Sequence, residues 1–137
     1  NILRRFRQLE TSILIGTDSF WEGIDVPGPA LSAIVIPKLP FPVPSDPTLE
    51  ALAEAREVDA FAQLSVPMMI LKLRQGIGRL IRRPDDFGVV VVLDSRLHWQ
   101  DYGRQVKDSL PPVLVKTGGA KQLSLALKKW FKKANMR

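Results

Sequence analysis

The feature that most constrains the fold is an unbroken apolar run, Val89–Leu93, that ends at Asp94. Four consecutive valines followed by leucine are typical of a strand buried on both faces, as in a parallel sheet. Leu31–Pro37 is a second run of this kind, and Ser12–Gly16 is a shorter one that ends in glycine. Helical patterns separate these runs. The order therefore predicts an α/β domain with a mainly parallel sheet.

Capping residues and apolar periodicity predict the intervening helices. Asp46 is expected to cap a helix that starts at Pro47 and runs toward Phe61, and Ser65 is expected to cap a second, Met68 to about Ile81. Further on, the sequence predicts a helix over residues 102–110, a short strand over residues 113–115, and an amphipathic helix over residues 120–134. The apolar side of that last helix carries Leu123, Leu127, Trp130 and Phe131.

A proline-rich loop is predicted over residues 37–47. It holds prolines at positions 37, 40, 42, 44 and 47, which exclude both a helix and a central strand. Long loops of this kind are uncommon in compact domains unless they have a function.

Composition excludes several classes of site. The 137 residues include no cysteine and one histidine, so a disulfide scaffold, a zinc finger and a cysteine nucleophile are excluded within this chain. No apolar run approaches the length of a membrane span, and Asn1 opens no signal-peptide pattern. We expect a cytoplasmic piece of a longer chain, with no membrane partner.

The net charge of +6 is unevenly distributed along the chain. Residues 41–70 are acidic overall, whereas residues 71–100 and especially 101–137 are basic. A basic half can indicate a phosphate or nucleic-acid partner, although a lysine-rich terminal helix can equally be a solvated face.

The most informative stretch is Gln75–Arg82, with the sequence Gln-Gly-Ile-Gly-Arg-Leu-Ile-Arg. On a helix, Gln75, Arg79 and Arg82 fall at positions i, i+4 and i+7 and share one face. Gly76 and Gly78 each weaken a helix by about 1 kcal/mol relative to alanine, so their presence indicates close backbone approach there.

Two aligned guanidinium groups suit the charge that develops on a phosphoryl group in transfer. An arginine in that role contributes about 10³ to 10⁵ in rate. The alternative is structural, with Arg79 and Arg82 forming salt bridges to Asp85, Asp86 or Asp94.

A second candidate segment, residues 16–28, follows the first predicted strand, where ligands bind in open α/β sheets. Hydroxyls can hold phosphates and aromatic rings can stack on bases, while the alternatives are helix caps at Asp18 or Ser19 and core packing of the rings. Asp25 could accept from a ribose hydroxyl or an arginine. The polar and aromatic residues are Thr17, Asp18, Ser19, Phe20, Trp21, Glu22 and Asp25.

These stretches together resemble the C-terminal motor domain of superfamily two DNA helicases of the DinG/XPD branch. Residues 17–28 are similar to motif V of that family, and Gln75–Arg82 is similar to motif VI, Q-x-x-G-R-x-x-R. The resemblance spans roughly residues 10–112. Further similar segments are Leu39–Pro47, Val92–Arg96, Tyr102–Gly103 and Leu110–Pro112.

The resemblance implies a RecA-like domain of the P-loop NTPase type, from an ATP-dependent DNA-repair helicase that moves 5′ to 3′ on single-stranded DNA. It implies that Arg79 and Arg82 reach the ATP phosphates as arginine fingers, and that Gln75 links ATP to domain movement. The ATP cleft would include Glu22, Gly23, Asp25 and Gly78. The DNA groove would include Thr17, Ser19, Phe20 and Trp21.

Two motifs of such enzymes are missing from this chain, the phosphate loop G-x-x-x-x-G-K-[ST] and D-E-x-H. Both belong to the first motor domain of the family, which would hold magnesium and lie upstream of Asn1. Because the predicted strands are few, we expect a domain truncated at its N-terminus and inactive alone. Some members carry an iron–sulfur cluster upstream, about which this segment says nothing.

Two other functions are compatible with parts of the sequence. A non-catalytic nucleic-acid-binding module would rest on the basic C-terminal half and the aromatic residues. A serine hydrolase would rest on Asp94, Ser95 and His98, which lie too close in sequence to converge without a special loop.

Overall fold

The centre of the molecule is a parallel pair of strands, β1 (Ala33–Ile36) and β2 (Val89–Val92). The computed structural model describes residues 2–9, 11–17, 26, 31–80, 87–111 and 115–134. Ala33 pairs with Val89 and Ile36 with Val92, so the two carboxyl ends meet at one edge. The two strongest apolar runs therefore form the predicted parallel α/β arrangement.

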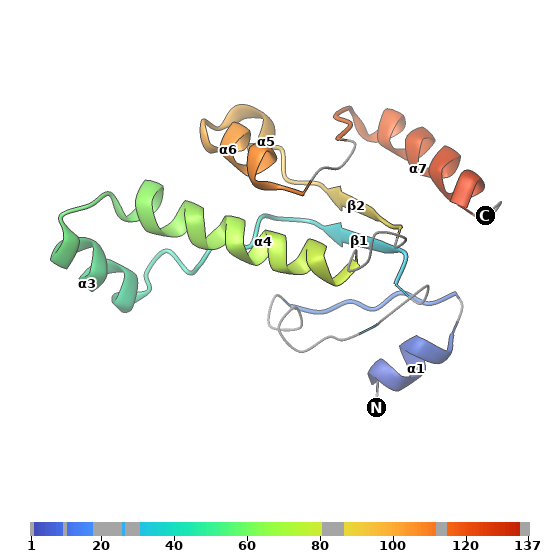
Figure 1. The fold of residues 1–137 in the computed structure, drawn as a ribbon, viewed down its shortest axis with the longest axis horizontal. Coiled ribbons are helices and arrows are strands. Elements are labelled where there is room, and N and C mark those ends of the chain that lie inside the picture. The colour runs from blue at the N-terminus through green and yellow to red at the C-terminus, as the bar shows by residue number, and fades with distance from the viewer. Residues whose placement is uncertain are drawn as a thin grey trace.

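Helices surround this pair (Figure 1). Between the strands the chain forms α3 (Pro47–Arg56), the π-helical turn η2 (Phe61–Ser65) and α4 (Val66–Leu80), and α4 runs alongside the sheet (Figure 1). The other helices are α1 (Ile2–Gln8), α5 (Arg96–Trp99), α6 (Tyr102–Ser109) and α7 (Ala120–Ala134).

The core fixes α4 and α6 to one face of the sheet. Ile36, Met69, Leu73 and Val106 are almost completely buried in a single cluster. Full burial of such side chains stabilises the fold by about 1.5–3 kcal/mol each. The alternate strand residues Ile34, Val90 and Val92 pack against the same cluster. The orientation of α4 is therefore set by its apolar face.

The opposite face of the sheet carries the remaining strand residues. Val35 is 57% exposed, whereas Val91 lines a shallow groove that is closed on its other side by α7. The ring of Trp130 on α7 lies 6.1 Å from that of Phe87, just before β2. The apolar side of α7 is thus turned toward β2.

The start of α3 is as predicted, and its end is earlier. The Thr48 N–H donates to the Asp46 carboxylate at 2.9 Å, and Pro47 takes the first position. The helix stops at Arg56 rather than near Phe61. Glu57 adopts the left-handed conformation at φ 54°, and its N–H satisfies the last carbonyls of the helix.

The second helical segment begins earlier than predicted, because Asp59 caps it instead of Ser65. The Asp59 carboxylate accepts from the Ala62 N–H at 2.5 Å, so Ser65 lies inside a continuous helix. Pro67 has no N–H to donate to the carbonyl four residues before it. The wider π turn η2 lies directly before this position, at the junction with α4.

The predicted strand over residues 12–16 is wrong as a sheet element. These residues are extended, but the described part of the chain offers them no strand partner. Ile13 and Ile15 are 90% and 89% exposed. An apolar run favours extended backbone, while a strand also needs a neighbour for its N–H and C=O groups.

The later elements follow the prediction closely. α7 has the predicted bounds, and α6 ends one residue early. The predicted strand over residues 113–115 lies largely outside the described residues. α5 was not predicted because four residues give no periodic signal. Among the described residues, no helix combines the length and apolar character needed to cross a membrane.

Candidate functional site

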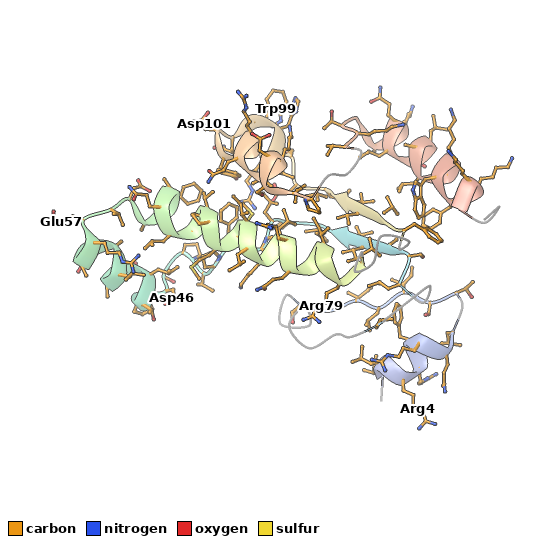
Figure 2. The ribbon with its side chains drawn as sticks, viewed as in Figure 1. Arg4, Asp46, Glu57, Arg79, Trp99 and Asp101 are labelled. Carbon is orange, nitrogen blue, oxygen red and sulfur yellow. The ribbon has the colours of Figure 1, made fainter. Side chains whose placement is uncertain are left out.

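The last turns of α4 carry the residues of the Gln75–Arg82 stretch that the structure describes. Leu73, Ile77 and Leu80 are buried and hold this end of the helix to the core. Gln75 is exposed and Arg79 half-buried. Figure 2 shows Arg79 projecting from α4 away from α5 and α6. Gln75 and Arg79 therefore lie on the side of α4 that faces away from the core, as the helical spacing predicts.

The glycines of this segment have different surroundings. Gly76 is buried, whereas Gly78 is exposed and a Cβ added there would meet no atom within 4 Å. A third glycine, Gly88, allows close approach before β2, because a Cβ there would overlap the Leu80 side chain. The end of α4 thus rests against the start of β2 and leaves the Gly78 position open.

Most of the other predicted site residues lie outside the described part of the chain. Thr17 is described and exposed, at the end of the extended segment. Arg82 and most of residues 16–28 are not described, so their geometry stays a prediction. The predicted site residues concerned are Arg82, Ser19, Phe20, Trp21, Glu22, Gly23 and Asp25.

The side chain of Asp94, which follows β2, connects the ends of the two strands. Its carboxylate accepts from the backbone N–H of Leu39 at 2.9 Å, in the loop after β1. The Arg96 guanidinium donates to both carboxylate oxygens, with Nη2 2.7 Å from Oδ2 and Nε 3.0 Å from Oδ1. This hydrogen-bonded guanidinium lowers the pKa of the Asp94 carboxyl to about 2.

An aromatic cluster adjoins the ion pair of Asp94 and Arg96. The Arg96 guanidinium carbon lies 5.2 Å from the centre of the Phe41 ring. Phe41 stacks on Phe61 at 5.6 Å and meets the edge of Tyr102 at 5.5 Å. One carboxylate therefore connects the proline-rich loop, η2 and α6.

Two of the alternatives raised by the sequence involve Asp94: a salt bridge to the arginines of the Gln75–Arg82 stretch, and a serine hydrolase site. Asp94 is engaged by Arg96 and Leu39, while Asp85 and Asp86 lie outside the described residues. The His98 ring packs against Trp99 at 4.7 Å. Asp94 is thus committed to the loop, and these contacts do not assemble the serine hydrolase site.

The sequence analysis did not predict that Asp94 connects the ends of the two strands. Its signal is an acid directly after a buried strand, with an arginine two residues later, at the edge where the loop after β1 also starts. The partner N–H at Leu39 is 55 residues away, so no local pattern indicates it.

Comparison with known proteins identifies the family. The model of the helicase C-terminal domain matches residues 1–113. The chain is 45% identical over 114 residues to the ATP-dependent DNA helicase YoaA of Escherichia coli, covering 81% of this chain and 18% of that protein. It is 42% identical over 131 residues to the ATP-dependent helicase DinG of Mycobacterium tuberculosis, covering 93% of this chain and 20% of the relative.

A third relative is named for a different activity. The 3′-5′ exonuclease DinG of Bacillus subtilis is 39% identical over 117 residues, which are 83% of this chain and 13% of that protein. The chain therefore spans a fifth or less of the length of these three relatives. The matched region contains β1, α4 and β2, and with them Gln75, Arg79 and Asp94. The chain belongs to the helicase C-terminal domain family.

Proposed function

We propose that this chain is the second motor domain of a cytoplasmic ATP-dependent DNA helicase that acts in DNA repair and moves 5′ to 3′ on single-stranded DNA. The observation that carries the proposal is the face of α4 that bears Gln75 and Arg79. The opposite face of this helix is fixed to the sheet by Leu73 and Ile77, so the outward face is rigidly presented. This arrangement occurs in a chain of the helicase C-terminal family.

In the proposed mechanism, ATP binds between this domain and an upstream motor domain that supplies the phosphate loop and holds magnesium. Closure brings Arg79 and Arg82 to the phosphates, where their guanidinium groups stabilise charge on the transferring phosphoryl group. Gln75 senses the same cleft, which also includes Glu22, Gly23, Asp25 and Gly78. An iron–sulfur cluster, where the parent protein has one, belongs upstream as well.

The strand of DNA would lie along Thr17, Ser19, Phe20 and Trp21. Hydroxyl groups hold phosphates, and aromatic rings stack on bases. Cleft closure and opening would then move this strand past the domain.

The test is DNA-stimulated ATP hydrolysis by the longer protein that carries this chain. Replacing Arg79 or Arg82 with alanine is expected to lower turnover by about 10³ or more, because charge on the transferring phosphoryl group loses its partner. Binding of single-stranded DNA is expected to remain close to that of the unmodified protein.

Arg74→Ala is the matched control, since Arg74 is an exposed arginine of α4 that points in another direction from Arg79. It should leave turnover nearly unchanged. Near-normal hydrolysis by the Arg79 and Arg82 variants would contradict the assignment.

A second candidate function is a non-catalytic nucleic-acid-binding module, which the lysine-rich α7 favours. The helix carries five lysines and no acid, at positions 121, 128, 129, 132 and 133. Under this function ATP would have no effect, and the Arg79 variant would behave like the Arg74 control.

A further inference from the structure

A hollow of about 760 Å³ lies where the two strands end, between the proline-rich loop and the residues after β2. The carboxyl ends of parallel strands are where open α/β sheets bind ligands. This hollow is separate from the Gln75–Arg79 face, which lies at the far end of α4. It is lined by Pro37, Lys38, Phe41, Pro42, Val43, Pro44, Leu93, Asp94, Ser95 and Arg96.

The wall of the hollow is held in one shape. Its prolines fix their own φ angles. The Phe41 N–H donates to the Leu39 carbonyl at 2.8 Å, and the Asp46 N–H donates to the Val43 carbonyl at 3.1 Å. The Asp94 carboxylate ties Leu39 to the end of β2. A ligand would therefore meet a preorganised surface and would not have to order the loop.

The charge of the hollow is positive. The carboxylate of Asp94 is neutralised by Arg96, and its side chain is only 7% exposed. Lys38 is exposed, and no described residue pairs with its ammonium group. Ser95 adds an exposed hydroxyl. The available polar groups are thus a cation and a hydroxyl, which suit a phosphate.

The rest of the lining is apolar. Pro42, Val43 and Pro44 present hydrocarbon surface beside Phe41, whose ring is covered by the Arg96 guanidinium and stacked on Phe61. Such surface fits the face of a base or a sugar and offers a polar peptide few partners. The hollow therefore places groups that suit a phosphate beside surface that suits a base.

We propose that this hollow binds a nucleotide unit of single-stranded DNA, with Lys38 holding the phosphate and the prolines beside Phe41 contacting the sugar or base. The proposal rests on the proposed function, because it adds a binding position for the strand that the helicase would move. The same chemistry would take a free nucleotide, so the two sources need separate measurements.

The experiment compares Lys38→Gln with Lys107→Gln in the longer protein, because Lys107 is an exposed lysine of α6 that does not line the hollow. Binding of a labelled oligothymidylate and of thymidine monophosphate is measured against salt. Lys38→Gln should weaken oligothymidylate binding by about tenfold and reduce the salt slope by about 0.7, the value of one single-strand phosphate contact. Lys38→Arg should restore both.

The outcomes separate the sources and the two proposals. A loss for oligothymidylate alone or for both probes supports the strand site, and a loss for the monophosphate alone overturns it in favour of a free-nucleotide site. Unchanged binding of both probes overturns the proposal altogether. DNA binding and ATP turnover should stay near normal in the Lys107→Gln control, and unchanged DNA binding in Lys38→Gln would leave the Arg79 test unaffected.

Discussion

Asp94 connects parts of the chain that are far apart in sequence, because its carboxylate holds both Leu39 and Arg96. Its pKa of about 2 lies below the unfolded value, so the carboxylate contributes stability that is fully present above about pH 4. That contribution is lost as the pH falls from about 4 to 2. Asp94→Asn is therefore expected to cost about 2 kcal/mol near neutral pH.

The measurement is urea unfolding at several pH values. The difference between Asp94→Asn and the unmodified protein should shrink in the acid range, where both lack the charge. Asp108→Asn is a control, because its carboxylate is 73% exposed and lies 3.8 Å from Arg104 in a surface pair. An equal, pH-independent loss in both variants would contradict the role of Asp94.

Replacement by alanine is expected to change stability in opposite directions at two helical glycines. A Cβ on Gly78 would meet open space, so Gly78→Ala should stabilise α4 by about 1 kcal/mol. A Cβ on Gly103 would overlap the Leu97 carbonyl oxygen, so Gly103→Ala should destabilise the fold. Thermal unfolding of both variants checks this.

The same Gly78 variant tests the ATP cleft. If Gly78 lies in the cleft, the added methyl group occupies space that the nucleotide or the upstream domain needs, and ATP turnover falls while stability rises. A variant that is both more stable and fully active would exclude Gly78 from the cleft.

At the scale of elements, α7 is the helix that lies outside the match to the helicase C-terminal domain model, which ends at residue 113. Its apolar side faces β2, through Leu123, Leu127 and the packing of Trp130 against Phe87. Its five lysines are exposed, and Lys128 also lines the groove beside β2. No described side chain of α7 is buried, and Leu125 and Phe131 are 60% and 36% exposed, so α7 lies beside β2 without burying its own apolar residues.

Replacing the four lysines 128, 129, 132 and 133 with glutamine is expected to reduce the salt slope of single-stranded DNA binding by about 0.7 for each phosphate that the helix no longer neutralises. Circular dichroism should show unchanged helix content, since the apolar side is intact. A slope equal to that of the unmodified protein would identify these lysines as a solvated face.

The sequence predicted most elements because their signals are local. Asp46 and Pro47 mark the start of α3, and the valine run marks β2. The errors arose where the decisive group lies elsewhere. Asp59 takes the cap expected of Ser65, and the residues 12–16 have the composition of a strand without a paired neighbour among the described residues.

In the whole molecule, the candidate site likewise has one part that the sequence predicts and one part that it does not. The shared side of Gln75 and Arg79 follows from helical spacing within one element. The hollow beside Lys38 could not be predicted, because it requires the register of β1 with β2 and the hydrogen bond between Asp94 and Leu39. Periodicity specifies faces of elements, and sites between elements depend on how the chain packs.

The chain by itself is expected to show no ATP hydrolysis, because its sequence contains no phosphate loop to cradle the nucleotide. A coupled assay on the purified 137-residue chain, with and without single-stranded DNA, checks this expectation. Hydrolysis that survives purification and disappears in an Arg79→Ala version would show that the chain carries a complete site. In that case, the proposed need for an upstream domain would be wrong.

The π turn η2 also limits which changes of length the chain can tolerate. It holds one residue more than an α-helical turn, so deleting one residue from Phe61–Ser65 would leave an α-helical turn and nearly preserve the rotation of α3 relative to α4. Deleting a residue within α4 would instead rotate everything before it by about 100° and separate Phe61 from Phe41. A homologue that is one residue shorter between β1 and β2 is therefore expected to lack the π turn.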